Sequence, residues 1–334
     1  MKLGWIALAL LFTIIGLAPS LTDAADQKKS ASIPAISIHS MAIHVSNVER
    51  SLNWYQALFG VPVTARDEHS IILRIGDGPQ RLAIVAAAGS APGISKIGFG
   101  VKDLDADRAL SILRKHDVAS SANPGSLKAL KPDRNAKFRN AAEVRFKDPA
   151  GITVALWDLS PETIEQTPVT TLRPAAPHGL LSLREYNHFT IFVPDANSNV
   201  QFYQRLFDLR IDTYQGPMPI IRVGNGNQFL AFVGDRSNAF VHHACFTVDD
   251  FDPDRIIGQL EKHGLKPRSA NRGPAGPLEY YLTMRMPDRG GAPQGTPELY
   301  LTDPDGILLQ IQDARYSGGG GYLGDKRGVP KKSD

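Results

Sequence analysis

The sequence of 334 residues contains a single cysteine, Cys245, and has little net charge. One cysteine excludes a disulfide within the chain and any zinc site built from a cysteine cluster. The 37 lysine and arginine residues nearly balance the 34 aspartate and glutamate residues, so the net charge of +3 does not argue for a nucleic-acid partner. After residue 24 no apolar run is long enough to cross a bilayer, and we expect no membrane contact once the leader is removed.

The one long apolar run extends from Leu3 to Leu17 and follows a positive charge at Lys2. It is shorter than the roughly 20 residues that span a bilayer, and Thr22-Asp23-Ala24 has the spacing of a cleavage site. We therefore expect residues 1–24 to be a Sec-type signal peptide, followed by a polar linker over residues 25–37. This places the mature protein in the periplasm or outside the cell, with an uncleaved membrane anchor as the alternative.

The rest of the chain is an internal repeat. Residues 74–85 align with residues 222–233, and Asp148-Pro149-Ala150-Gly151 aligns with Asp303-Pro304-Asp305-Gly306. The repeat predicts an N-terminal domain over residues 38–160 and a C-terminal domain over residues 183–315. A linker over residues 161–182 joins them, and residues 316–334, rich in glycine and lysine, are expected to form a flexible tail.

Each domain divides again into two units of a strand, a helix and several strands. The first helix is expected to begin at a capping box, Ser46-Asn47-Val48-Glu49, and to end at Gly60. We predict an α+β fold of two tandem domains, each a pair of βαβββ modules that form a curved sheet with a cleft. Arg74 and Arg222 stand at matched positions before glycine-rich turns, and we expect them at a surface or an interface, with an anion-binding role as the alternative.

Comparing the two domains separates three polar residues from their counterparts. His188, His243 and Gln310 occupy strand positions that are Ser40, Lys96 and Ala155 in the N-terminal domain. Side chains alternate between the two faces of a strand, so His243, Cys245 and Thr247 share one face, as do His188, Thr190 and Phe192. The apolar alternate positions, such as Ala244 and Phe246, should pack in the core. These residues should therefore line the C-terminal cleft, with His242 at its rim.

The strand-opening histidines and the Asp-Pro-x-Gly turn before the last strand resemble the vicinal oxygen chelate superfamily, which includes glyoxalases, bleomycin-resistance proteins and extradiol dioxygenases. Four modules with the site in the second pair resemble the extradiol dioxygenases most. The resemblance implies a metal held by His188, His243 and Gln310, although the dioxygenases carry glutamate at the third position. The run from Leu299 to Gln310 otherwise resembles the dioxygenase signature, in which Tyr300 is a catalytic hydrogen-bond donor beside the ligands.

Three functions follow from this resemblance. The first is an exported dioxygenase-like metalloenzyme that binds the vicinal oxygens of a small substrate at a divalent metal, with Fe(II) preferred and Mn, Zn or Ni as alternatives. The second is a glyoxalase-like lyase or isomerase. The third is a metal-free protein that binds a small molecule, as bleomycin-resistance proteins do. In each case Thr190, Phe192, Cys245 and Thr247 are expected to contact the small molecule, and homo-oligomerisation is left open.

Overall fold

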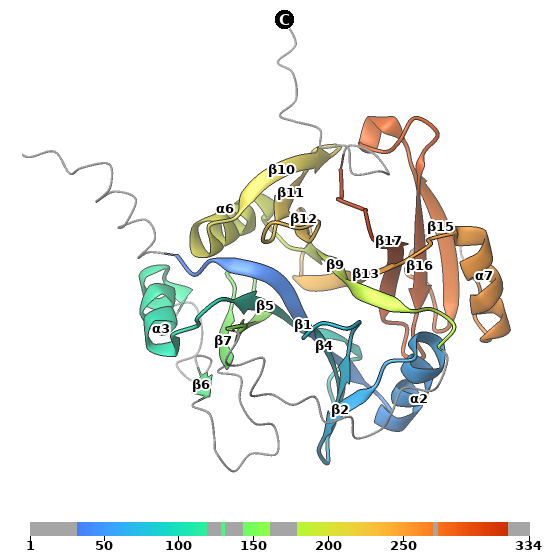
Figure 1. The fold of residues 1–334 in the computed structure, drawn as a ribbon. Helices are drawn as coiled ribbons and strands as arrows, with labels where there is room; N and C mark the ends of the chain where they lie inside the picture. The colour runs from blue at the N-terminus through green and yellow to red at the C-terminus, as the bar shows by residue number, and fades with distance from the viewer. Residues whose placement is uncertain (1–31, 119–127, 131–142, 161–178, 270–272, 320–334) are drawn as a thin grey trace, which may run out of the picture.

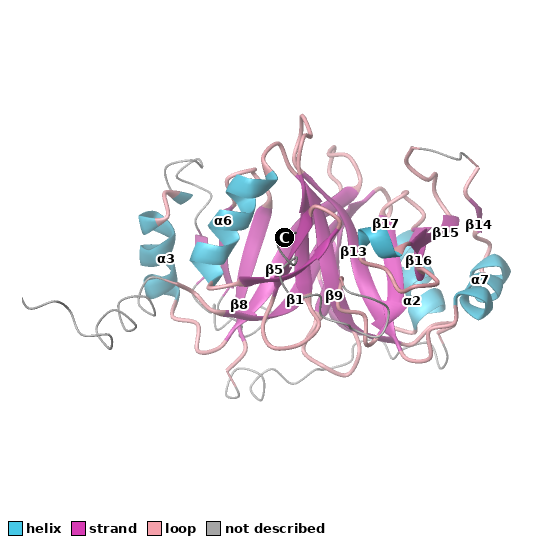
Figure 2. Cartoon of the chain, turned by 90° about the horizontal axis from the view of Figure 1, so that it is seen from above, coloured by secondary structure: helices cyan, strands magenta, loops and turns pink. Residues whose placement is uncertain are grey.

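The computed structural model describes residues 32–118, 128–130, 143–160, 179–269 and 273–319. The predicted signal peptide lies outside these residues, as do the N-terminal part of the predicted linker at 161–178 and the chain beyond 319. Two mixed sheets form the centre of the molecule, and the helices lie on the outside (Figures 1 and 2). In the described part of the chain, no helix is both long and apolar enough to span a membrane.

The first sheet contains two βαβββ modules, as predicted. The strand order is β2-β3-β4-β1-β5-β8-β7-β6, so β1 and β5, which open the two modules, lie side by side at its centre. The first module is β1 (Ala35–Val45), α2 (Val48–Phe59), β2 (Val63–Arg66), β3 (Ser70–Arg74) and β4 (Arg81–Ala86). The second is β5 (Gly93–Val101), α3 (Ala106–Lys115), β6 (Lys128–Leu130), β7 (Glu143–Lys147) and β8 (Thr153–Asp158).

The second sheet repeats this arrangement with one additional short strand, in the order β10-β11-β12-β9-β13-β17-β16-β15-β14. Its first module is β9 (Leu183–Phe192), α6 (Ala196–Phe207), β10 (Arg210–Gln215), β11 (Met218–Arg222) and β12 (Phe229–Val233). Its second module is β13 (Phe240–Val248), α7 (Pro253–Lys262), β14 (Lys266–Pro267), β15 (Glu279–Arg285), the 3-10 turn η2 (Pro287–Arg289), β16 (Thr296–Thr302) and β17 (Leu308–Asp313).

Helix α2 shows how local sequence sets an element. It begins at Asn47, whose side chain accepts a hydrogen bond from the backbone N–H of Arg50, and it ends at Gly60, whose φ of 64° favours glycine. The capping-box prediction implied Ser46 as the N-cap, but the N-cap is Asn47. Ser46 instead donates a hydrogen bond to Asp305, which is in the other domain. The predicted cap was wrong because this tertiary contact takes the Ser46 hydroxyl.

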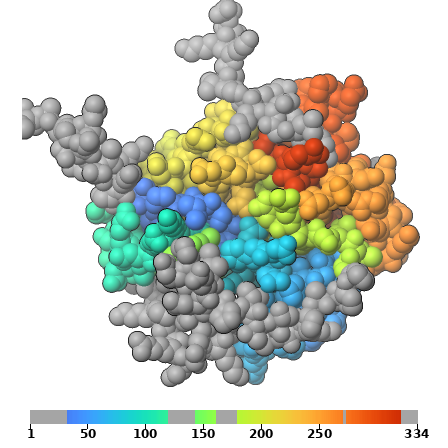
Figure 3. Space-filling model, in the orientation of Figure 1, coloured from blue at the N-terminus to red at the C-terminus, as the bar shows by residue number. Residues whose placement is uncertain are grey.

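The two domains meet in an interface that repeats itself. Gln80 donates to the carbonyl of Ile38 and accepts from the backbone N–H of Tyr186, at 2.9 and 2.8 Å. Gln228, the counterpart of Gln80, donates to the carbonyl of Tyr186 and accepts from the N–H of Ile38, at 2.8 and 2.7 Å. The two glutamines are buried, and so are Ile38 and Tyr186, whose backbones they contact. The two glutamine side chains therefore join β1 to β9 through four hydrogen bonds. The halves therefore meet along a continuous boundary (Figure 3).

A second repeated contact explains the Asp-Pro-x-Gly turns. Asp303 turns back on the backbone N–H groups of Asp305 and Ile307, and it also accepts a hydrogen bond from the hydroxyl of Tyr55 on α2. In the twin contact, Asp148 accepts a hydrogen bond from the hydroxyl of Tyr203 on α6. Each turn is thus both a tight turn within its own domain and the anchor for a helix of the other domain.

Candidate metal centre

The two histidines predicted to be metal ligands lie together on the second sheet. In the antiparallel pair β9–β13, Cys245 lies opposite His188 and His243 lies opposite Thr190, so the histidines are diagonal neighbours. Their rings are nearly perpendicular, at 80°, and their Nε2 atoms are 3.2 Å apart. Both side chains are buried. We call the face of the second sheet that carries them the site face.

The remaining nitrogen of each histidine has its own partner. His188 Nδ1 lies 2.8 Å from Asn187 Oδ1, and Asn187 is held in turn by its hydrogen bond to the carbonyl of Tyr316. Because Asn187 Oδ1 can only accept, the proton of neutral His188 is on Nδ1. His243 Nδ1 lies 2.8 Å from His242 Nδ1. His242, which is half-buried, is therefore a hydrogen-bond partner of a site histidine, and it stacks on Phe192 with ring centroids 4.3 Å apart.

The electrostatics of the site keep these imidazoles neutral. Burial lowers the pKa of His188 to about 3, helped by the positive charge of Arg285. Burial also lowers the pKa of His243 well below its usual value, with His188 and His242 contributing. Neutral imidazole is the form that binds a metal, so neither histidine has to lose a proton at neutral pH.

Gln310 completes the predicted set. It lies on β17 directly beside Cys245 on β13, so its amide reaches the histidine pair, where it opposes the lowering of both pKa values. Neither its Oε1 nor its Nε2 makes a hydrogen bond of good geometry, although the side chain is 1% exposed. An unsatisfied buried amide costs free energy and requires an explanation. In the described residues, no cluster of three or more His, Cys, Asp or Glu side chains is arranged to hold a metal ion.

These residues fit a divalent metal. Two nitrogens that each lie about 2.1 Å from one ion are about 3.0–3.4 Å apart when the angle between the bonds is roughly 90–110°. His188, with its proton on Nδ1, presents an Nε2 lone pair 3.2 Å from His243 Nε2, which presents a lone pair as well when the His243 proton is on Nδ1 and faces His242. The amide oxygen of Gln310 supplies a third donor. The alternation of side chains also agrees with the sequence argument, because Ala244, Phe246, Leu309 and Ile311 all pack in the main core.

Tyr300 lies beside this set, opposite Gln310 across the β16–β17 pair. Its ring meets the edge of His243 at 5.4 Å and stacks on Tyr281, while its hydroxyl lies 3.4 Å from Glu298 Oε2. Burial and the charge of Glu298 raise the pKa of Tyr300 well above its usual value, so the hydroxyl remains a donor. Its position against His243 agrees with a role next to the ligands.

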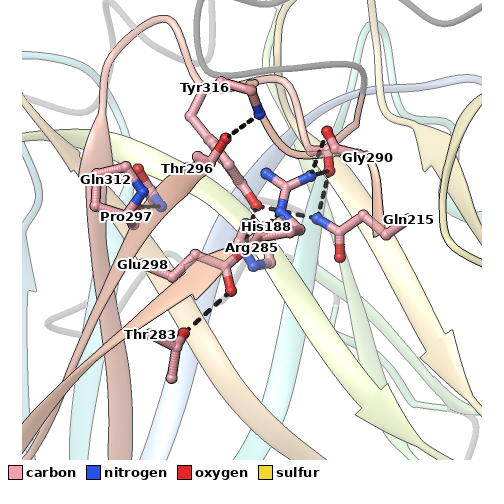
Figure 4. A network of polar contacts seen from close by, with 12 residues as sticks. His188, Gln215, Thr283, Arg285, Gly290, Thr296, Pro297, Glu298, Gln312 and Tyr316 are labelled. Atoms are coloured by element: carbon pink, nitrogen blue, oxygen red, sulfur yellow. Dashed lines mark hydrogen bonds and ion pairs between the residues drawn. The ribbon is translucent and has the colours of Figure 1, made fainter. Parts of the chain in front are cut away.

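The same face carries an ion pair that was not predicted from the sequence. Arg285 is buried and donates through Nε to Glu298 at 2.9 Å and through Nη1 to the carbonyls of Gly290 and Gly318, while its Nη2 has no partner (Figure 4). Glu298 also accepts from the hydroxyl of Tyr316 at 3.1 Å. One signal was available, because Glu298 aligns with Glu143 in the first repeat and both precede the Asp-Pro-x-Gly turn by five residues. The same residue at equivalent positions of both copies indicated a glutamate with a role in each sheet.

The predicted flexible tail is, at its beginning, part of the site face. Tyr316 and Ser317 are each 1% exposed, and Tyr316 lies against His188 and Phe229. Gln215 on β10 and Arg285 on β15 both donate to the carbonyl of Gly318, although these strands lie near opposite edges of the sheet. The sheet therefore curls around this segment. The prediction of a tail from residue 316 was wrong for residues 316–319, because these polar anchors hold a glycine-rich backbone that composition alone marks as mobile.

The four residues expected to contact a small molecule differ in their settings. Thr190 and Cys245 lie beside the histidines in the strand register, and burial, together with the charge of Glu298, raises the pKa of the Cys245 thiol well above its usual value. The hydroxyl of Thr247 contacts the carbonyl of Glu185, 3.4 Å away. Phe192 stacks on His242 and is covered by the guanidinium of Arg236. The structure thus brings Thr190 and Cys245 to the histidine pair, while Phe192 and Thr247 lie farther along their strands.

The fold and the site define a tandem α+β protein of paired βαβββ modules with a histidine pair in its second half. The chain belongs to the Glyoxalase/Bleomycin resistance protein/Dioxygenase superfamily, whose family model matches residues 37–156 and 185–311. No curated protein matches the sequence.

Solved structures share this fold at low sequence identity. A catechol 2,3-dioxygenase is 15% identical with a TM-score of 0.58, over 90% of this chain and 92% of that one. A homoprotocatechuate 2,3-dioxygenase from Arthrobacter globiformis is 17% identical with a TM-score of 0.58, over 91% and 85% of the two chains. A Mn(II)-bound glyoxalase from Novosphingobium aromaticivorans is 13% identical with a TM-score of 0.57, over 83% and 82%. The architecture is thus similar both to dioxygenases and to a glyoxalase.

Proposed function

We propose that the C-terminal half binds a divalent metal ion through His188, His243 and Gln310 and that the protein is a metalloenzyme acting on a small substrate with vicinal oxygens. A dioxygenase is the first choice, with Fe(II) as the preferred ion. One observation carries the proposal: the Nε2 atoms of two buried imidazoles lie 3.2 Å apart beside a buried amide that makes no hydrogen bond of good geometry. The similarity of the fold to extradiol dioxygenases supports the reaction class. Export by the N-terminal leader remains part of this proposal.

A bound divalent ion would supply Lewis-acid chemistry and lower the pKa of coordinated substrate hydroxyls. Side chains of the protein would orient the metal ligands and contact the substrate. Asn187 and His242 hold the two imidazoles through contacts to their Nδ1 atoms, which would leave the Nε2 side of each ring for the metal. Tyr300 keeps its proton and can donate a hydrogen bond to a substrate oxygen. Arg285 adds a positive charge on the same face, which favours a deprotonated substrate.

The segment from Tyr316 to Gly319 bears on substrate access. Tyr316 lies against His188, and the Gly318 carbonyl is held by Gln215 and Arg285. A substrate that reaches the histidines would therefore take the place of this segment. We infer that its release precedes binding, and that Arg285, already with one unpartnered nitrogen, then becomes available to an oxygen of the substrate.

The test of this function is metal content. The full chain is loaded anaerobically with Fe(II), Mn(II), Zn(II) and Ni(II) in turn, and bound metal is measured by mass spectrometry in the wild type and in His188→Ala/His243→Ala. About one metal ion per chain, lost in the double variant, is the expected result. The matched control is His116→Ala/His263→Ala, which removes two histidines from the ends of α3 and α7 and should keep the metal. Equal binding in the wild type and the His188→Ala/His243→Ala variant would refute the site.

The similarity to a Mn(II)-bound glyoxalase favours a second reaction, a glyoxalase-like isomerisation or lyase step at the same residues. Oxygen uptake separates the two reactions. With the metal-loaded protein and a panel of catechols, a dioxygenase consumes one O₂ per substrate, whereas an isomerase converts its substrate under argon. Oxygen uptake that disappears in Tyr300→Phe while metal content is unchanged would assign Tyr300 a catalytic role.

A further inference from the structure

The first sheet has a face equivalent to the site face, and its chemistry is different. We call it the twin face. In both sheets the same register holds: Ser40 lies opposite Gly98 and Gly98 beside Ala155, as His188 lies opposite Cys245 and Cys245 beside Gln310. The metal-ligand positions therefore hold Ser40, Lys96 and Ala155. A hydroxyl, an ammonium and a methyl group form a poor set for a cation but not for an anion.

The twin face carries an excess of positive charge. Arg74 on β3 and Arg81 on β4 lie directly opposite each other, an arrangement of like charges that is destabilising unless something neutralises it. Within the described parts of the chain, neither guanidinium has an ion-pair partner. Glu143 is the acid on this face, and it is shared by Lys96 at 2.8 Å and Arg145 at 2.6 Å. Among the side chains that the structure describes on this face, Arg74, Arg81, Lys96 and Arg145 thus accompany the single carboxylate of Glu143.

The second sheet shows how such an arginine is normally neutralised. Arg222, the counterpart of Arg74, is buried and forms an ion pair with Asp212 at 2.8 Å. The counterpart of Asp212 in the first sheet is Thr64, and the counterpart of Arg81 is Phe229. The first sheet has therefore lost the acid and gained a second arginine. Burial lowers the pKa of Arg81, which reports the cost of a partly buried charge without a partner.

Three buried polar atoms near these cations also lack partners. They are His39 Nδ1, Ser40 Oγ and Trp157 Nε1. The ring of Trp157 lies 5.8 Å from the Arg81 guanidinium, 5.7 Å from the Lys96 ammonium and 5.5 Å from the His39 ring. At Gly98, an added Cβ would stand 2.1 Å from Ser40 Oγ and 3.0 Å from Trp157 Nε1. The Ser40 hydroxyl and the Trp157 indole therefore fill the space above Gly98, and both lie beside the cations.

We propose that the twin face is a second binding site, which takes a small dianion such as a phosphate-bearing or dicarboxylate molecule through Arg74, Arg81, Lys96, Ser40 and Trp157. Arginine forks form paired hydrogen bonds with planar carboxylates and with phosphates, and two forks side by side match two negative charges. The indole N–H and the hydroxyl add neutral donors. The site is in the half without the histidine pair, so it stands or falls independently of the metal centre.

Thermal unfolding tests the site with two probes, inorganic phosphate and phthalate, against chloride at the same ionic strength. Ligand that binds only the folded state raises the melting temperature by mass action. The wild type is expected to melt at a higher temperature with millimolar concentrations of either probe. Arg81→Gln should lose this shift, and without any probe it should melt at or above the wild-type temperature, because an unneutralised charge has been removed. Arg74→Gln, which leaves Trp157 untouched, provides a second variant with the same expectation.

The matched control is Arg184→Gln, which removes an exposed arginine that pairs with Asp249 and should keep the full shift. A shift with phosphate alone identifies a phosphate-type ligand, a shift with phthalate alone a dicarboxylate, and both support the site. Two results with the probes overturn it: no shift in the wild type with either probe, or an undiminished shift in both Arg81→Gln and Arg74→Gln. A third is an Arg81→Gln protein that melts at a lower temperature than the wild type when neither of these two proteins responds to a probe. The last result would mean that Arg81 is neutralised by the chain itself.

Discussion

At the scale of single residues, the most informative position is Gln310. It stands where the resemblance to extradiol dioxygenases predicts glutamate, and its buried amide makes no hydrogen bond of good geometry. A neutral oxygen donor leaves the histidine pair without a negative ligand, while the nearby carboxylate of Glu298 is already paired with Arg285. The strength of metal binding should therefore depend on this one side chain.

Gln310→Glu is expected to tighten divalent-metal binding by at least about tenfold, which corresponds to about 1.4 kcal/mol. The physical reason is the added negative charge at a donor that already touches both imidazoles. Isothermal titration with Mn(II) or Zn(II) measures the change. Gln312→Glu is the matched control, because it adds the same charge two residues away on the same strand, where the amide bonds to the carbonyl of Pro297. Equal tightening in both variants would contradict a ligand role for Gln310.

At the scale of elements, strand alternation assigned the faces from His243 onward but not at His242, because the strand register shifts between Val241 and His243. The apolar run Ala244, Phe246, Val248 identified the core side of β13, so His243 had to lie on the other side, as it does. The same argument could not find Arg285 or Tyr316. Arg285 reaches the site across the curl of the sheet, and Tyr316 reaches it because the chain turns back after β17. Neither position can be predicted from a pattern in the neighbouring sequence, because both depend on how distant parts of the chain fold together.

The segment after β17 depends on Gly318, where φ is 90° and an added Cβ would lie 2.8 Å from the ring of Phe229. Gly318→Ala should cost about 1–2 kcal/mol in strain and overlap, which makes the released segment roughly 5–30-fold more populated. Metal loading, followed by stopped flow, should become faster by a similar factor. Gly216→Ala has the same kind of backbone strain, at φ 56°, with open space around it, and should load at the wild-type rate. Unchanged loading in Gly318→Ala would show that the segment does not gate the site.

At the scale of the whole molecule, the repeat predicted the two domains and their modules, but not how they dock. Sequence matching paired Asp148 with Asp303 and Tyr55 with Tyr203 as equivalents within separate copies. In the structure, each tyrosine bonds to the aspartate of the other copy. A repeat aligned with itself contains no information about which copy a side chain contacts, so this exchange could not be predicted.

The two turn aspartates should give the protein an unusual dependence of stability on pH. Burial raises the pKa of Asp148 and of Asp303 to about 6, so the folded state holds protons that the unfolded state has lost. Between roughly pH 4 and pH 6 the free energy of unfolding should therefore fall as pH rises, by up to about 3 kcal/mol for each carboxyl. Urea unfolding of the wild type and Asp148→Asn/Asp303→Asn, from pH 4 to pH 7, should show the variant gaining relative stability with pH.

Asp67→Asn is the control for this measurement, because its expected dependence has the opposite sign. Slight burial would raise the pKa of Asp67, but hydrogen bonds from His69 and Ser70 lower it overall. The wild type should therefore gain stability over this variant as pH rises through the acidic range. A stability difference between the wild type and the double variant that does not change with pH would rule out protonated turn aspartates in the folded state.

The hydrogen bonds by which Gln80 and Gln228 bridge β1 and β9 affect how each half would behave if it were separated from the other. Each glutamine serves the backbone of both strands, and the atoms that it meets are equivalent in the two copies. The contact therefore has the self-complementary form of a symmetric dimer interface, although it lies within one chain. A half cut away from its twin would present both members of the contact at once. Such a half would have an exposed surface that favours homodimerisation. In the intact chain, the covalent link between the halves keeps the local concentration of the other half high, so the two halves of one chain pair first.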